Sequence, residues 1–154
     1  MQLTVVAPTT SARQTMAWPA VVAVAAGGAL GGLARHAVDL GLPAAAGAFP
    51  TGTLLINVVG CLLVGAVAGL VRRPVLFAFV APGLLGGFTT FSTYAVQTVD
   101  LALRGEVGVA TGYLFGTVVL ALVAVEAGLL LSRGLAHRAH GARRRSLSAP
   151  RPIG

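Results

Sequence analysis

The stretch from Pro82 to Tyr94 holds the residues with the clearest chemical potential in this chain. It combines a proline, three glycines and four serine or threonine side chains, within a run from Val75 to Val99 that has no charged residue. A helix in lipid must satisfy its backbone internally, so such an interruption persists only where protein or a polar site surrounds it. Carbonyls released at an interruption bind cations, and half-helix ends supply dipoles. The stretch predicts a broken membrane span that handles ions.

A single amide side chain, Asn57, interrupts a second apolar run. An amide in lipid costs about 1–2 kcal/mol even when a neighbouring helix supplies hydrogen bonds, so its presence needs a reason. Two interpretations remain open from the residue alone. The amide could tie two helices together, or its N–H groups could donate to an anion without adding a charge that would trap it.

Aromatic and hydroxyl side chains supply further groups suited to an anion. Phe91 and Tyr94 are three residues apart, which places their rings on one side of a helix, and a ring edge carries partial positive charge. Packing is the commoner role of such a pair. Tyr113 and Thr117 share a face of a later helix at four-residue spacing, which allows a path of hydroxyl groups. Ring edges, amide and hydroxyl donors together could replace the hydration of a small anion.

The composition indicates an integral membrane protein. The chain has 154 residues, of which 56% are hydrophobic and 10% are charged, which is too apolar for a water-soluble domain of this size. One cysteine, Cys61, and three scattered histidines give neither a disulfide framework nor metal-ligand spacing. The net charge of +7 comes from arginines at the ends of apolar runs and in the tail, so it favours membrane orientation over nucleic-acid binding.

Four apolar runs are long enough to cross a bilayer, which takes roughly 20 helical residues. They cover residues 17–34, 51–71, 75–99 and 107–131. We take the first as a span and not a signal peptide, because Arg35, His36 and Asp39 follow it before any cleavage pattern. The predicted organisation is an N-terminal tail (1–15), a four-helix domain (16–133) and an unstructured arginine-rich tail (134–154). This leaves no room for a soluble catalytic domain, so we expect no enzyme.

Glycines recur at four-residue spacing along three of the predicted helices. The sets are Gly27/Gly31, Gly28/Gly32, Gly65/Gly69 and Gly108/Gly112/Gly116. Small residues on one face let helix backbones approach closely where lipid provides no hydrophobic drive. The spacing alone does not divide these glycines between packing inside the subunit and contact between subunits.

Arginine placement predicts how the chain lies in the membrane. With four spans, both termini and the Arg72–Arg73 turn share one side, which holds nine arginines, five of them flanking a span. The other side holds only Arg35 and Arg104. The excess of positive charge predicts that both termini are cytoplasmic. We expect the tail arginines to meet anionic lipid headgroups.

Three segments resemble the signatures of the bacterial fluoride channels, the Fluc or CrcB family. They are Gly27–Arg35, Gly52–Gly60 and Gly86–Tyr94, and the likeness extends in order from Ala17 to Ser132. The resemblance implies an all-α subunit of four transmembrane helices with a break in the third. It also implies an antiparallel dual-topology dimer with two narrow pores. The function it implies is a fluoride-selective channel that exports cytosolic fluoride passively and so reduces its toxicity.

The same resemblance assigns roles to individual residues. It implies that the backbone carbonyls of Gly86 and Thr89 hold a structural sodium ion that is not transported. The residues that it implies for the anion pathway are Asn57, Phe91, Tyr94, Ser92, Thr93, Tyr113, Thr117 and Arg35. Three positions depart from the family pattern: Tyr94 stands where a phenylalanine is usual, Gln97 stands where an acidic residue is common, and a hydroxyl expected near Ala121 is missing.

These departures leave open a homodimer or a heterodimer with a homologous subunit, including a non-conducting partner role. A different class, the proton-coupled small multidrug exporters, also packs four spans in each subunit. That chemistry needs a carboxylate deep in the membrane, and the first three runs have none. Glu126 lies near the end of the fourth run, where it could pair with Arg133.

Overall fold

The computed structural model describes residues 17–43 and 47–147, and every regular element in this part of the chain is a helix. The predicted N-terminal tail (1–15) and residues 148–154 lie outside the described residues. The helices in chain order are α2 (Ala17–Gly41), α3 (Thr51–Leu70), α4 (Pro74–Ala78), the π-helix η1 (Phe79–Leu85), α5 (Gly86–Phe88), α6 (Ser92–Leu103) and α7 (Val107–Leu147).

Four segments within the described residues are long and apolar enough to cross a membrane. They are Trp18–Gly41, Thr51–Leu70, Pro74–Leu103 and Val107–Ala136, the third of which comprises α4, η1, α5 and α6. These segments confirm the four spans predicted from hydropathy.

Two helices extend beyond the predicted bounds. Helix α2 continues through Arg35 to Gly41, and α7 continues to Leu147. The expectation that the basic segment from residue 134 onward is unstructured is therefore wrong for residues 134–147. The segment is rich in alanine, leucine and arginine, which have high helix propensity, and the next proline is Pro150.

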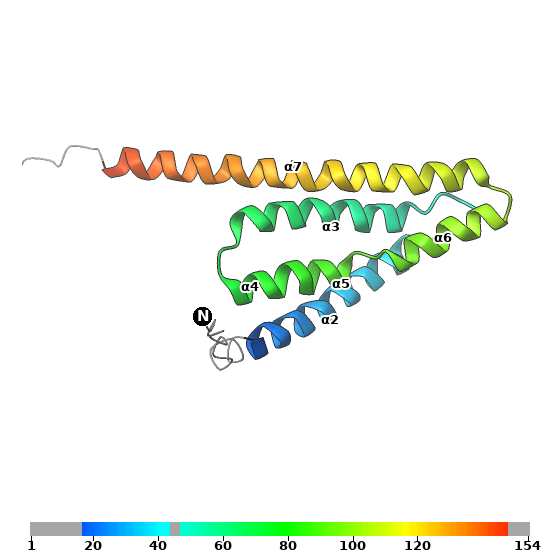
Figure 1. Cartoon of the computed structure of the whole chain (residues 1–154), viewed down its shortest axis with the longest axis horizontal. Helices are drawn as coiled ribbons and strands as arrows, with labels where there is room; N and C mark the ends of the chain where they lie inside the picture. The colour runs from blue at the N-terminus through cyan, green and yellow to red at the C-terminus, as the bar shows by residue number, and fades with distance from the viewer. Residues whose placement is uncertain (1–16, 44–46, 148–154) are drawn as a thin grey trace, which may run out of the picture.

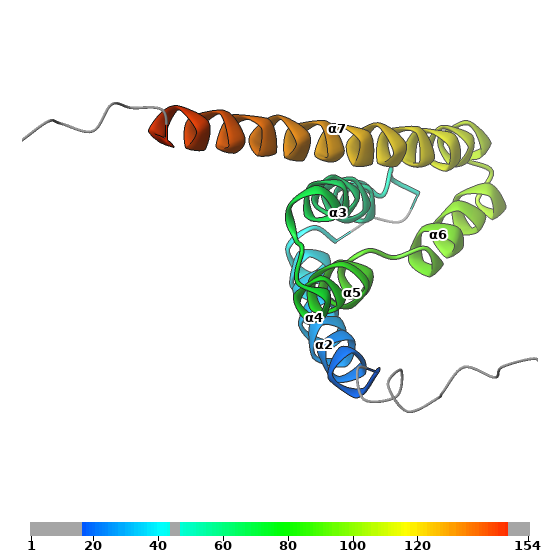
Figure 2. The same ribbon diagram turned by 60° about the vertical axis from the view of Figure 1, so that its left-hand side comes forward.

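The helices form two layers joined by α6 (Figures 1 and 2). Helix α3 runs beside α7 in the same direction, and this is the most extensive contact between elements. Helix α2 packs against α4, η1 and α5, and α6 crosses from this second layer to the start of α7. The end of α5 and the start of α6 thus lie between the two layers.

Glycines make both layer contacts close. A Cβ atom on Gly27 or Gly31 would overlap the backbone of the third span, and one on Gly65 would overlap the carbonyl of Val125. In contrast, a Cβ on any of Gly32, Gly108, Gly112 or Gly116 would meet nothing within 4 Å. The structure therefore separates the glycines into two groups. Those such as Gly27, Gly31 and Gly65 allow close packing within the subunit, whereas the second group makes no close contact within it.

The interior of the subunit is small, and its apolar surface is large. The fully buried side chains of greatest volume are Tyr113, Ile56 and Ser132, and leucine, valine and phenylalanine side chains are exposed along every span. In water this surface would be unfavourable, whereas lipid or a partner subunit can cover it.

A tight turn joins α6 to α7, and Gly105 in this turn has a φ of 85°. The adjacent Arg104 Nε donates to Asp100 Oδ2 at 2.8 Å on the exposed surface.

Candidate functional site

The third membrane-capable segment contains three residues, 89–91 between α5 and α6, that lie outside any helix, and we call them the interruption. A change in helical winding precedes them. Pro82 lies inside η1 and has no backbone N–H to donate, and η1 is wound as a π-helix. Short π-helical segments are frequent at functional sites. Helix α5 ends at Phe88, the backbone of Thr89 is extended (φ −72°, ψ 158°), and α6 begins at Ser92.

Asn57 joins α3 to this interruption through two hydrogen bonds to one residue. Its Nδ2 donates to the carbonyl of Thr90 at 2.9 Å, and its Oδ1 accepts from the Thr90 N–H at 2.8 Å. The amide thus pairs with Thr90 as a neighbouring strand would, and satisfies both backbone groups of a buried residue outside a helix. Of the two interpretations of Asn57, the helix tie is present, and the second Nδ2 proton is not used by these bonds.

Two N–H groups that a continuous helix would use are bonded elsewhere at the interruption. The Thr90 N–H, which would donate to the Gly86 carbonyl in an α-helix, donates to Asn57. The Thr93 N–H, which would donate to the Thr89 carbonyl, donates to Thr90 Oγ1 at 3.2 Å and so caps α6. The two carbonyls implied for sodium are thus among those at the interruption that lack their helical donors.

Arg35 reaches one of these carbonyls from α2. Its guanidinium donates to the Thr89 carbonyl at 3.2 Å, and the residue is half-buried. The Thr89 hydroxyl donates to the Leu85 carbonyl at 2.9 Å, which fixes the side chain against its own helix. A Cβ on Gly60 would overlap the Thr89 methyl group, so a glycine on α3 makes room for this residue.

Four aromatic rings form a row beside the interruption. Phe91 and Tyr94 have centroids 5.8 Å apart at an angle of 52°, Tyr94 and Tyr113 are 5.3 Å apart, and Phe49 meets Tyr113 edge-on at 5.3 Å. Tyr113 is fully buried, whereas 79% of Phe91 is exposed in the isolated subunit. The Phe91 end of the row therefore faces the outside of the subunit.

The two tyrosine hydroxyls are engaged within the subunit. Tyr94 donates to the Leu114 carbonyl on α7 at 2.6 Å, and Tyr113 donates to Gln97 Oε1 on α6 at 2.9 Å. Two of the departures from the family pattern, Tyr94 and Gln97, thus take part in contacts between α6 and α7. Tyr94 itself is buried, with 5% of its surface exposed.

A cavity of about 220 Å³ lies between α3, the interruption and α7. Its nine lining residues, none of which is an acid, an arginine or a histidine, are Asn57, Cys61, Thr89, Thr90, Phe91, Tyr94, Thr117, Val118 and Ala121. It brings together four of the residues implied for the anion pathway. The other four, Ser92, Thr93, Tyr113 and Arg35, and the sodium candidate Gly86, do not line it.

Thr117 has the most informative hydroxyl in this cavity. The Thr98 and Thr111 hydroxyls each donate to the carbonyl four residues earlier at 2.8 Å, which is the usual arrangement in a helix. Thr117 is 4% exposed, and its Oγ1 has no hydrogen-bond partner among the described residues. A buried hydroxyl without a partner is costly, and such a group marks a place where a ligand or water completes the bonding.

Sequence reasoning missed Thr90, whose backbone is the partner of Asn57 and whose Oγ1 also donates to Thr93 Oγ1 at 3.0 Å. It treated Gln97 only as a departure and did not single out Phe49. The sequence did contain an indication of Thr90, because Thr89 and Thr90 place two hydroxyl side chains in succession at the interruption. Glu126 is exposed on α7 and does not line the cavity, and the described ion pairs do not join it to Arg133.

The fold and the site define a small membrane protein of four spans with a largely apolar cavity that has no charged side chain and includes the Asn57 amide and the Thr117 hydroxyl. The CrcB family, described as CrcB-like protein, Camphor Resistance, matches residues 22–129. The chain belongs to this family.

Three relatives support the same assignment over most of their length. A protein of Paracoccus denitrificans (strain Pd 1222), named Fluoride-specific ion channel FluC, is 48% identical over 115 residues, which cover 73% of this chain and 93% of that protein. Nitrobacter hamburgensis (strain DSM 10229 / NCIMB 13809 / X14) has two. The one named Fluoride-specific ion channel FluC 1 is 42% identical over 78% of this chain and all of its own length. The one named Fluoride-specific ion channel FluC 2 is 46% identical over 71% of this chain and 93% of its own length.

The Tyr94 hydroxyl gives a prediction about stability. Replacing Tyr94 with phenylalanine removes the bond to the Leu114 carbonyl, and we expect the free energy of unfolding in detergent to fall by about 1 kcal/mol. The Leu114 carbonyl keeps its helical donor, so the loss stays small. Phe115→Leu, at an exposed position on the same helix, is the control and should change little. A Tyr94→Phe protein as stable as the original would show that the bond contributes nothing.

Proposed function

We propose that this chain is a subunit of a fluoride-selective channel that lets cytosolic fluoride leave the cell passively. The observation that carries the proposal is the match to relatives named fluoride-specific ion channels over nearly their whole length. The cavity supports it independently, because it offers donors without fixed charge. Fluoride is small and strongly hydrated, so a path for it must replace water with closely spaced donors and must not hold it too tightly.

Thr117, Asn57 and the aromatic edges are the groups proposed to replace that water. The Thr117 hydroxyl is buried without a partner, and the second Nδ2 proton of Asn57 is left over from its bonds to Thr90. Phe91 and Tyr94 border the same cavity, where their ring edges can meet an anion. Thr93 accepts from Thr90 and keeps its own proton to donate, so Thr93 and the exposed Ser92 extend the set of donors.

We infer that the interruption is a break of the third span within the membrane. We also infer that a resident sodium ion binds there. The carbonyls of Gly86 and Thr89 fit this role because their helical donors go to Asn57 and Thr90. Carbonyl oxygens are ligands for hard cations, and no group of three His, Cys, Asp or Glu side chains that could hold a metal occurs among the described residues. A carbonyl has two lone pairs, so Thr89 can accept from Arg35 and still face an ion. The ion would fix the break without taking part in transport.

The subunit is proposed to work as a dimer. Two features support this: Phe91 borders the cavity yet is largely exposed, and a row of glycines on α7 is unused within the subunit. A second, antiparallel copy or homologue against this face would enclose the cavity. The arginine excess favours one orientation for this chain, which in turn favours a homologous partner of opposite bias. Two relatives in one organism, named FluC 1 and FluC 2, are compatible with paired subunits.

Fluoride efflux from liposomes that contain the purified protein tests the function. The chain should release fluoride and retain chloride, alone or with its homologous partner. Thr117→Val keeps the shape of the side chain and removes its donor, so it should lower fluoride efflux by at least about tenfold while leaving stability equal or higher.

Thr111→Val is the matched control, because that hydroxyl is exposed and bonded to its own helix. Its efflux should equal that of the original protein. Unchanged efflux in Thr117→Val would remove the hydroxyl from the path. Absence of fluoride release in every subunit combination would contradict the function itself.

Replacement of sodium tests the proposed ion. In liposomes and detergent prepared with a large organic cation in place of sodium, we expect dimerisation and fluoride efflux to fall together and to return when sodium is restored. The reason is that the carbonyls at the break are left facing one another without a compensating charge. Flux and dimerisation that stay constant through rigorous exchange would contradict the sodium site.

Labelling of the termini tests orientation. A single cysteine at either end of a Cys61→Ala background should react in intact cells only with a permeant reagent, since both termini are expected in the cytoplasm. Arg104 on the opposite side is paired with Asp100, which further weakens the opposing charge. Equal labelling from both sides would instead indicate a chain that inserts both ways and needs no partner.

A further inference from the structure

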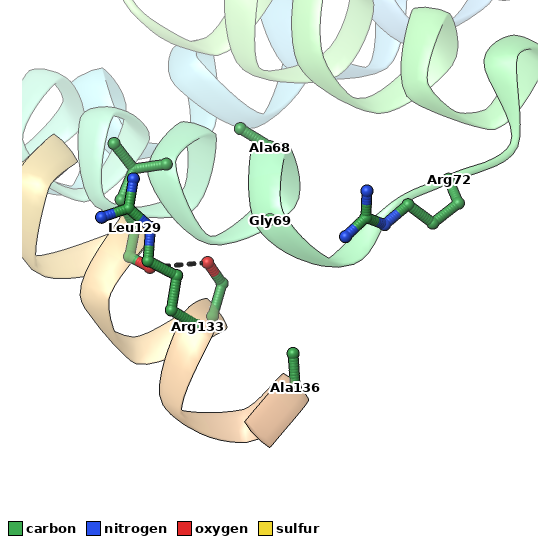
Figure 3. A pocket seen from close by; sticks show the side chains of 7 residues that line it. Ala68, Gly69, Arg72, Leu129, Arg133 and Ala136 are labelled. Atoms are coloured by element: carbon green, nitrogen blue, oxygen red, sulfur yellow. Dashed lines mark hydrogen bonds between the residues drawn. The ribbon is translucent and has the colours of Figure 1, made fainter. Parts of the chain in front are cut away.

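A second cavity, of about 550 Å³, lies at the other end of the contact between α3 and α7 (Figure 3). Its apolar wall includes Ala68 on α3 and Leu129 on α7, and Arg72 and Arg133 stand at its rim. Figure 3 shows Arg72 reaching in from the connection after α3 and Arg133 rising from α7. We call this space the two-arginine groove.

Ser132 and Gly69 form the part of the groove where α3 and α7 meet most closely. Ser132 is fully buried, and its hydroxyl donates to the Leu129 carbonyl at 2.8 Å, so its polar atom is satisfied inside the helix. A Cβ on Gly69 would overlap the Ser132 side chain, which keeps α3 close to α7 at this level. The groove is thus an open slot between two tightly packed helices.

Its depth in the membrane follows from the ends of the spans. Helix α3 ends at Leu70 and is followed by Arg72 and Arg73, and the apolar run of α7 ends at Leu131, before Ser132 and Arg133. The groove therefore lies where both helices leave their apolar runs. Arginines that flank the ends of membrane spans lie at the level of lipid headgroups, so we infer that level for the groove. The apolar wall then faces the beginning of the acyl chains, and the arginines face the phosphates.

The two arginines are available for an anion. Both side chains are exposed, and the ion pair found in the described part of the chain is Arg104 with Asp100, far along the sequence from either of them. A guanidinium presents a planar set of donors that matches a phosphate in two-bond geometry. Basic pockets between transmembrane helices on the cytoplasmic side are suited to anionic headgroups.

We propose that the two-arginine groove binds one anionic phospholipid, with its phosphate at the rim that carries Arg72 and Arg133 and an acyl chain along Leu129. Charge complementarity and the position at the span ends select a lipid over a soluble partner. The site is separate from the cavity near Asn57 and shares no lining residue with it. The proposal does not rest on fluoride conduction.

Native mass spectrometry of the delipidated full-length protein tests this site. Phosphatidylglycerol should be retained at one tight site per subunit, and phosphatidylcholine should not. Arg72→Gln and Arg133→Gln should each weaken phosphatidylglycerol retention by about tenfold. Arg73→Gln is the matched control, because Arg73 has the same charge at the next position but does not line the groove. Arg72→Lys, which keeps the charge, should recover part of the affinity.

Several outcomes would overturn the proposal. Equal loss in Arg73→Gln would indicate diffuse charge attraction, and equal retention of the two lipids would indicate no headgroup recognition. Displacement of the lipid by millimolar inorganic phosphate would indicate a site for a soluble anion. A shift from dimer to monomer in the variants, with lipid retention unchanged, would indicate a contact between subunits.

Discussion

The pairing of Asn57 with Thr90 is the interaction on which the rest of the site depends. A membrane-capable span that stops being helical exposes backbone groups that lipid cannot satisfy. One amide satisfies both groups of Thr90 at 2.8 and 2.9 Å, and so it stabilises the interruption from a neighbouring helix. Charge is not needed for this, which keeps the surrounding cavity neutral.

The geometry around this pairing links structure to function. Taking the Thr90 N–H away from Gly86, and giving the Thr93 N–H to Thr90 Oγ1, turns two carbonyls into candidate cation ligands. After the extended backbone at Thr89, α6 begins at Ser92, and its Tyr94 ring lies against Tyr113 of α7. The aromatic row, the buried Thr117 hydroxyl and the cavity between them follow from where α6 begins.

Much of this could be predicted from the sequence, because membrane spans obey simple rules. Hydropathy located the four spans, and the composition of residues 82–94 located the unusual segment. The end of α7 could not be predicted in this way, since a basic segment reads as a tail although arginine and alanine favour helix. The partner of Asn57 was also out of reach, because it is a backbone group of Thr90, 33 residues away. The spacing of the glycines predicted which of them share a helix face. Whether a face packs within the subunit depends on the fold, in which Gly65 packs against α7 and Gly112 makes no close contact.

Amide hydrogen exchange at Thr90 tests the central claim most directly. In the intact protein this N–H should be protected, although it lies outside any helix, because it donates to Asn57. In Asn57→Ala its exchange should become at least about tenfold faster. The Ala95 amide, which donates to Phe91 within the same span, should keep its rate. A Thr90 amide that exchanges equally in both proteins would contradict the account, because the interruption would then be held by something other than Asn57.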